Sequence, residues 1–137
     1  MPRTTRAVPT AALALTVATL VPACGGGGTP QVLRPDVDQF RTGTCREAAP
    51  AVLAVGDLGV RLRGAAAVPA GDRATLASEQ RRLQKLRTSA ELTEPVRALV
   101  TAIGFVRIRV DSNTYEPELM STLVDEQQRL VARCTTG

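Results

Sequence analysis

Four stretches of the sequence repeat apolar residues every three or four positions, which is the spacing of one buried helix face. Only three aromatic side chains accompany them, Phe40, Phe105 and Tyr115, and the chain has no Trp. A core built from Leu, Val, Ile and Ala favours packed helices, because strands are enriched in aromatic and β-branched residues. We therefore expect an all-α domain over residues 44–135, folded as an antiparallel four-helix bundle.

The first predicted helix begins at Thr44, which stands three residues before Glu47, as in a capping box. Pro50 should bend this helix. Gly56 and Gly59 have two interpretations, a close crossing with a neighbouring helix or a ligand groove lined by bare backbone. The expected inward face is thin and consists of Cys45, Ala48, Val52, Val55, Gly59, Leu62 and Ala66.

The second predicted helix runs from near Asp72 to about Ser89 and is the most polar of the four. Its expected inward residues are Leu76, Leu83 and Leu86. A basic cluster lies on it, formed by Arg81, Arg82, Lys85 and Arg87. Such a cluster is either a solvated helix face with partners such as Glu79, or a contact site for anionic lipid headgroups or an acidic envelope polymer.

The third predicted helix has Thr93 as its cap and Pro95 in its first turn. Residues 105–110 also alternate in polarity as a strand would. We favour a helix because the helical periodicity continues from Val96 and no partner strand is visible elsewhere. The expected inward residues are Val96, Leu99, Ile103, Val106 and Val110.

The fourth predicted helix enters through Glu116 and Pro117, an acidic residue and a proline in its first turn. Its apolar stripe consists of Met120, Leu123, Gln127, Leu130 and Cys134. In an antiparallel bundle the first helix starts at the end where the fourth helix finishes. Cys45 and Cys134 should therefore meet there and form a disulfide that closes about 90 residues, with two buried thiols as the alternative.

The amino terminus has the organisation of an export signal. Arg3 and Arg6 precede an apolar run over residues 7–21. This run is too short to cross a membrane as a helix, because a membrane-spanning helix needs roughly 20 apolar residues. A basic start, an apolar centre and small residues before a cleavage point are typical of a signal peptide, here residues 1–23.

The end of this run resembles the lipobox of bacterial lipoproteins, carried by Leu20, Val21, Pro22, Ala23 and Cys24. The resemblance implies that Cys24 receives a diacylglycerol and becomes the first mature residue. Membrane attachment through that lipid, on the extracytoplasmic face of the cell membrane, would follow. The alternatives are ordinary secretion, with Cys24 as a free thiol, and an uncleaved anchor.

Residues 24–43 are expected to form a flexible tether, because they contain the glycine run 25–28 followed by Pro30 and Pro35. Lipid on Cys24 also explains the odd number of cysteines, three, in an exported chain. The composition, the lipobox and the two later cysteines resemble small alanine- and arginine-rich actinobacterial lipoproteins. That resemblance implies a compartment and no activity.

Several functional classes are disfavoured. The chain has no His, which removes the most common general base and metal ligand. Removing the two signal-peptide arginines leaves 17 − 2 = 15 basic against 13 acidic residues, a net charge of +2, which gives no electrostatic case for nucleic acid. We find no catalytic or metal-binding motif, and we expect neither enzyme activity nor a cofactor.

These observations predict a membrane-anchored, non-enzymatic helical module that binds or scaffolds an envelope protein or polymer. The alternative is a lipoprotein that holds a small ligand or polymer between its helices. An interaction module should present an apolar surface patch, whereas a ligand carrier should contain an enclosed pocket with a few convergent polar groups.

Overall fold

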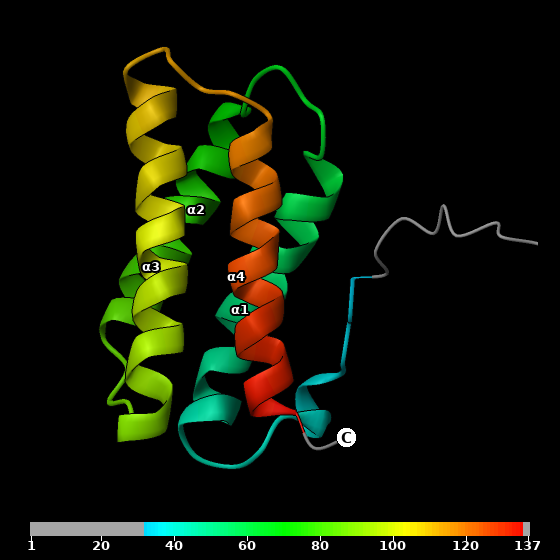
Figure 1. Ribbon diagram of the computed structural model, residues 1–137, viewed down its shortest axis with the longest axis vertical. Helices are drawn as coiled ribbons and strands as arrows, with labels where there is room; N and C mark the ends of the chain where they lie inside the picture. The colour runs from blue at the N-terminus through cyan, green and yellow to red at the C-terminus, as the bar shows by residue number, and fades with distance from the viewer. Residues whose placement is uncertain (1–31, 136–137) are drawn as a thin grey trace, which may run out of the picture.

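A computed structural model describes residues 32–135, so the predicted signal peptide, Cys24 and the glycine run lie outside the described residues. The described part contains a short 3₁₀ helix and four α-helices (Figure 1). Their bounds are η1 (Val37–Gln39), α1 (Thr44–Arg61), α2 (Ala70–Gln84), α3 (Ala90–Asp111) and α4 (Glu118–Cys134).

The four α-helices form an antiparallel bundle, which confirms the predicted fold (Figure 1). Each helix packs against the next one in sequence, and α4 packs back against α1, so the bundle is closed. The largest fully buried side chains are Phe40, Leu58, Leu76, Leu83, Leu99, Ile103, Met120 and Leu123. The predicted inward stripes are correct except that Ala66 is exposed and that Leu86 and Val110 are only half-buried.

The carboxyl-terminal ends of the first two helices differ from the predictions, and that of the third agrees. The first helix stops at Arg61, before Gly64, whose φ of 73° lies in the left-handed region that ends helices. The second helix ends at Gln84 and not near Ser89, because Ser89 is the N-cap position of α3. The third helix continues to Asp111, so residues 105–110 are helical and the strand alternative is wrong.

The predicted capping box at Thr44 is also wrong. Gly43 occupies the N-cap position, and Thr44 is the first residue of α1. The Thr44 hydroxyl instead donates a hydrogen bond to the backbone oxygen of Arg87, at 3.0 Å. A contact across 43 residues has therefore replaced the local one, and it joins the start of α1 to the connection between α2 and α3.

A buried glutamine faces a glycine where α4 crosses α1. Gln127 is 1% exposed, and its Nε2 donates to the backbone oxygen of Val52 at 3.1 Å. A Cβ on Gly56, one turn after that carbonyl, would lie 2.6 Å from Nε2, and one on Gly59 would lie 2.5 Å from Val124 Cγ2. The two glycines therefore permit a close helix crossing, as one of their two interpretations predicted.

The same arrangement occurs where α2 crosses α3. Gln80 Nε2 donates to the backbone oxygen of Val100 at 3.0 Å, and a Cβ on Gly104 would lie 2.9 Å from that nitrogen. Arg107 donates to the other end of the same amide at 2.6 Å. In both crossings the glycine lies four residues after the residue whose carbonyl accepts the hydrogen bond. Because the glycine has no Cβ, the buried glutamine amide has room to reach that carbonyl.

Gly56→Ala is expected to lower the free energy of unfolding by about 1–2 kcal/mol. The new methyl group displaces the Gln127 amide from its hydrogen bond, which costs more than the roughly 1 kcal/mol that Ala gains in helix propensity. Denaturant unfolding measures the change. Gly71→Ala is the matched control, because Gly71 is exposed in α2 and a Cβ added there would have nothing within 4 Å. It should be neutral or stabilising, and equal effects of the two substitutions would contradict the role of Gly56.

Candidate interaction surface

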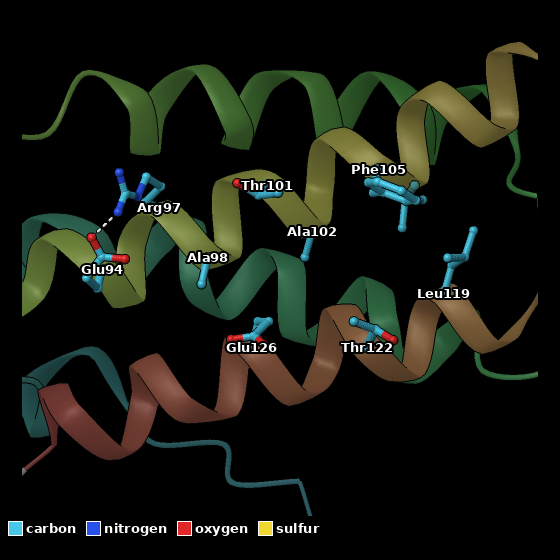
Figure 2. A pocket seen from close by; sticks show the side chains of 10 residues that line it. Glu94, Arg97, Ala98, Thr101, Ala102, Phe105, Leu119, Thr122 and Glu126 are labelled. Carbon is cyan, nitrogen blue, oxygen red and sulfur yellow. Dashed lines mark hydrogen bonds and ion pairs between the residues drawn. The ribbon is translucent and has the colours of Figure 1, made fainter.

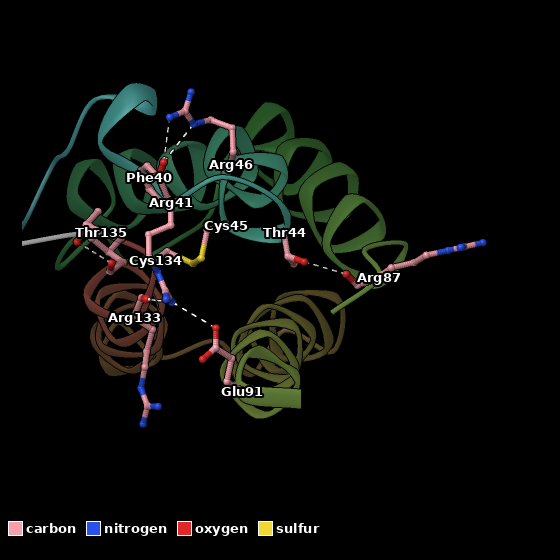
Figure 3. Close-up of a disulfide and its surroundings, with 11 residues drawn as sticks. Phe40, Arg41, Thr44, Cys45, Arg46, Arg87, Glu91, Arg133, Cys134 and Thr135 are labelled. Carbon is pink, nitrogen blue, oxygen red and sulfur yellow. Dashed lines mark hydrogen bonds and ion pairs between the residues drawn. A yellow bond between two sulfur atoms is a disulfide. The ribbon is translucent and has the colours of Figure 1, made fainter. Parts of the chain in front are cut away.

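The end of the bundle where α1 begins is closed by the predicted disulfide. Cys45 and Cys134 are bonded, with their Cα atoms 5.2 Å apart and a sequence separation of 89 (Figure 3). Both residues are buried. The disulfide therefore joins the first and last helices, as the antiparallel topology predicted.

Residues 32–43, which were predicted as part of the tether, pack against this end instead. Phe40 is 1% exposed and pairs with Thr135 in an antiparallel β-bridge. The backbone N–H of Arg41 donates to the oxygen of Cys134 at 2.8 Å (Figure 3). Arg46 donates to the oxygen of Phe40 at 3.0 Å. The packed domain therefore starts before Thr44, and only residues 24–31 of the predicted tether lie outside the described part.

The beginning of this segment is held against α4 and α1. The backbone of Leu33 makes two hydrogen bonds with the Gln128 side chain, at 2.7 and 3.1 Å. Arg34 forms an ion pair with Asp57 at 3.4 Å. The segment thus lies on the α1 and α4 side of the bundle.

The basic cluster lies at the same end of the bundle as the disulfide. Arg81 and Arg82 are in the last turn of α2, Lys85 is its C-cap, and Arg87 lies in the connection to α3, outside the helix predicted for it. All four residues are at least partly exposed. Arg82 forms an ion pair with Glu79 at 3.1 Å, as expected of a solvated face, whereas the other three form no ion pair within residues 32–135.

An open groove runs along the bundle between α3 and α4 (Figure 2). One section, of about 540 Å³, lies between Phe105 and Leu119 at one end and Glu94 at the other. A second section, of about 580 Å³, continues past Glu94 towards Arg133. Small side chains form much of the lining, namely Ala90, Ala98, Thr101, Ala102, Thr122 and Ala132.

Two large apolar side chains on α3 stand in solvent beside the groove. Phe105 is 53% exposed and Ile108 is 67% exposed. The guanidinium of Arg109 lies 5.8 Å from the centre of the Phe105 ring, within cation–π range. The buried periodicity of α3 does not indicate this surface. The available signal was the four- and three-residue spacing of Thr101, Phe105 and Ile108, which is separate from the buried stripe of α3.

Charged side chains border the groove. Glu94 and Arg97, one turn apart on α3, form an ion pair (Figure 2). The hydrogen bond from Arg97, together with its positive charge, lowers the pKa of Glu94 below its ordinary value. On the α4 side, Glu126 pairs with Arg129 at 2.7 Å. Glu94 is therefore ionised over a wide pH range, and the groove combines an apolar lining with a charged rim.

Tyr115 lies in the connection between α3 and α4, and its hydroxyl is buried with no hydrogen-bond partner in the described part of the chain. Burial, with a smaller contribution from the charge of Glu118, raises the pKa of Tyr115. The folded domain therefore prefers the neutral phenol. This preference contributes stability below the unfolded pKa of about 10, and the contribution is lost as the pH rises through the higher folded value.

Tyr115→Phe is expected to be neutral or to stabilise the domain by about 1 kcal/mol at pH 7, because it removes an unpaired buried hydroxyl. Above about pH 10 the unmodified protein should lose stability faster than the variant. Thermal unfolding of both proteins from pH 7 to pH 11 measures this. Parallel pH profiles would show that the Tyr115 hydroxyl is solvated in the native domain.

The described residues give no sign of a metal centre. Among residues 32–135, no three His, Cys, Asp or Glu side chains gather in a group able to hold a metal ion. No helix in that range is both long and apolar enough to cross a membrane.

No protein-family model matches this chain, and comparisons with curated proteins and with solved structures find no significant similarity.

Proposed function

We propose that this chain is a lipoprotein held on the extracytoplasmic face of the cell membrane by lipid on Cys24, and that its bundle is a non-enzymatic interaction module. The open α3–α4 groove, with Phe105 and Ile108 exposed beside it, is the observation that carries the second part. Exposed apolar side chains next to a groove are typical of surfaces that bind other macromolecules.

The cysteine inventory supports the first part. The chain has three cysteines, and the disulfide uses Cys45 and Cys134, so Cys24 is left over. Structural disulfides persist outside the cytoplasm, where a lipoprotein of this kind would be located. One remaining cysteine at the end of a lipobox-like sequence, in an exported chain, is best explained by acylation of that cysteine.

The docked amino-terminal segment limits how far the bundle can move from the membrane. If residues 32–43 stay packed, only eight residues, 24–31, separate the lipid from the domain. Eight extended residues reach about 27 Å. A partner of the groove would therefore lie close to the membrane surface, and the exposed basic cluster would lie within reach of anionic headgroups.

The shape of the groove favours an interaction module over a ligand carrier. Both sections are open along their length and lined by residues of the bundle surface, such as Thr122 and Ala132. A small ligand held between helices would instead need an enclosed pocket with convergent polar groups. We therefore propose docking of a macromolecular surface along α3 and α4.

Cys24→Ala tests the anchor. The wild-type chain should be recovered in the membrane fraction and resist extraction with high salt, because salt weakens charge contacts but leaves an acyl anchor intact. The variant should lose that salt-resistant association. The matched control replaces Cys45 and Cys134 with Ala and should stay with the membrane. Equal salt-resistant binding of Cys24→Ala would contradict attachment through this sulfur, unless sizing shows that it has retained residues 1–23, which is the uncleaved-anchor alternative.

A further inference from the structure

Positive charge is unevenly distributed over the described domain, and α2 carries the excess. Residues 73–89 contain five basic residues and one acidic residue, Glu79, which is buried and paired with Arg82. The rest of residues 32–135 contains ten basic and twelve acidic residues. The domain is therefore strongly positive along α2 and slightly negative over the remainder, although its total charge is close to balanced.

The end of a helix does not by itself explain the basic cluster. A helix dipole favours cations in the last turn, where Arg81 and Arg82 lie. Arg87 lies beyond the helix, and its side chain points away from the bundle (Figure 3). Arg81, Lys85 and Arg87 are exposed and form no ion pair with any residue of the described range. These three cations are therefore available to an external anion.

The neighbouring helices do not neutralise this surface. From α3, Arg107 donates to Gln80 of α2 at 2.6 Å, and Asp111 lines a small pocket together with Arg73. From α1, Glu47 stands exposed in the first turn. When these three charged neighbours are added to residues 73–89, the surface contains six basic and three acidic residues, so it remains positive.

The outward face of α2 suits contact with a broad, flat surface. Much of this face consists of small residues that are exposed or half-exposed: Ala70, Gly71, Ala74, Ala77 and Ser78. The large apolar side chains that are exposed in the described chain lie on the docked segment and on α3, not on α2. A membrane contact through α2 would therefore be made by charges at the level of the headgroups, without apolar insertion.

The tether proposed above is long enough to bring α2 to the membrane. The docked segment lies against α4 at Leu33, and α4 does not contact α2, so α2 is diagonally across the bundle (Figure 1). The outer surface of α2 is about 20 Å, or two helix diameters, from the opposite side of the bundle. The eight residues 24–31 reach about 27 Å when extended. The lipid on Cys24 can therefore enter the bilayer beside α2 with little slack.

We propose that the basic cluster contacts anionic phospholipid headgroups and orients the anchored bundle, with α2 towards the membrane and the α3–α4 groove away from it. The proposal rests on the lipid anchor proposed above and adds which face of the domain meets the bilayer. Each basic residue near an anionic surface strengthens the attraction about fivefold. Because the anchor already holds the domain beside the headgroups, they are favoured over an acidic polymer, and three such contacts are enough to orient the bundle.

The first test measures orientation in vesicles that contain the purified, lipid-anchored protein and a quencher on the headgroups. A fluorescent amino acid replaces either Gln84, which is exposed beside Lys85, or Thr122 in the α3–α4 groove. In vesicles of phosphatidylcholine with phosphatidylglycerol, the Gln84 probe should be quenched about threefold more than the Thr122 probe. The difference should largely disappear in phosphatidylcholine alone, and also in about 1 M salt, where charges are screened beyond roughly 3 Å.

The outcomes of this test separate the orientation from the anchor. Equal quenching of the two probes in anionic vesicles, in protein that stays with the vesicles at high salt, would overturn the orientation and leave the anchor standing. An equally large difference in neutral vesicles would also overturn the role of the charges. Protein that does not stay with the vesicles at high salt would contradict the anchor and the orientation together.

The second test reverses single charges. Arg81→Glu and Lys85→Glu should each lower the quenching of the Gln84 probe in anionic vesicles by about threefold. Arg109→Glu is the matched control, because it changes the net charge equally but Arg109 lies over Phe105, beside the groove. It should have no effect. Thermal unfolding checks that each variant is folded, and two cluster variants are used so that a folding defect in one leaves the other. Equal effects of all three variants, or no effect of a folded cluster variant, would overturn the contact.

The third test identifies what the cluster contacts in cells. A photo-crosslinking amino acid at Gln84 should form adducts mainly with phospholipid, and the same probe at Thr122 should form few lipid adducts. Adducts of the Gln84 probe mainly with an acidic polymer or with another protein would overturn the headgroup contact. A macromolecular adduct at Thr122 is expected of the interaction module, and its absence would contradict that module without changing the result for the orientation.

Discussion

Reduction of the Cys45–Cys134 disulfide is expected to lower the free energy of unfolding by about 4 kcal/mol. The bond closes a loop across 89 residues of sequence, so it removes a large share of the conformational freedom of the unfolded chain. A domain of this size has only about 5–15 kcal/mol of stability in total, and the loss should lower the melting temperature by roughly 15 °C or more.

Denaturant unfolding of the oxidised and reduced proteins measures this effect. The control is Cys24→Ala, which leaves the disulfide intact and should not change the stability of the bundle. A difference between oxidised and reduced protein below about 1 kcal/mol would mean that the unfolded chain is already compact, or that the bond is dispensable for the fold.

Phe40→Ala is expected to destabilise the domain by about 3 kcal/mol. Phe40 is 1% exposed and packs in the core that also contains the disulfide, so the substitution leaves a large apolar cavity. The result is informative because Phe40 lies in a segment whose sequence predicts a tether.

Val37→Ala is the matched control for Phe40→Ala, since Val37 lies in the same segment but is 40% exposed. It should cost less than about 1 kcal/mol. Denaturant unfolding of the two variants decides between the alternatives. Similar small effects would indicate that residues 32–43 contribute little to the fold and behave as a tether.

The sequence predicted the helices and their pairing because the information for both is local or topological. Apolar periodicity identified the inward faces, and antiparallel order placed Cys45 beside Cys134. The helix ends were less predictable because distant contacts determine them. Thr44 has a good local capping partner in Glu47, yet its hydroxyl bonds to the backbone of Arg87, which sequence spacing cannot indicate.

The docking of residues 32–43 could not be predicted for a similar reason. Phe40 is a single aromatic residue among polar neighbours, and it has no periodic pattern around it. Its burial depends on a bridge to Thr135 at the other end of the chain. The Pro and Gly content from which a tether was predicted determines how stiff the chain is, but it does not indicate which long-range contacts the chain makes.

The candidate surface could not be predicted, because its residues differ from buried apolar residues only in that no helix of the bundle packs over them. Ile108 fits the apolar face of an alternating strand as well as an outer helix face, and only the packing of the bundle shows that Phe105 and Ile108 remain in solvent. The glutamine and glycine pairs at the helix crossings are likewise recognisable only in space. The sequence placed Gln127 in a predicted inward stripe, but it did not show that the Gln127 side chain packs against Gly56.

The most direct test of the proposed membrane anchor is the mass of the amino-terminal peptide of the mature protein, recovered from membranes of the cells that produce it. We predict a peptide that begins at Cys24 and carries a diacylglycerol on its sulfur. A peptide that contains residue 24 with a free thiol, from protein released into the medium, would contradict the anchor and the compartment assigned to this chain.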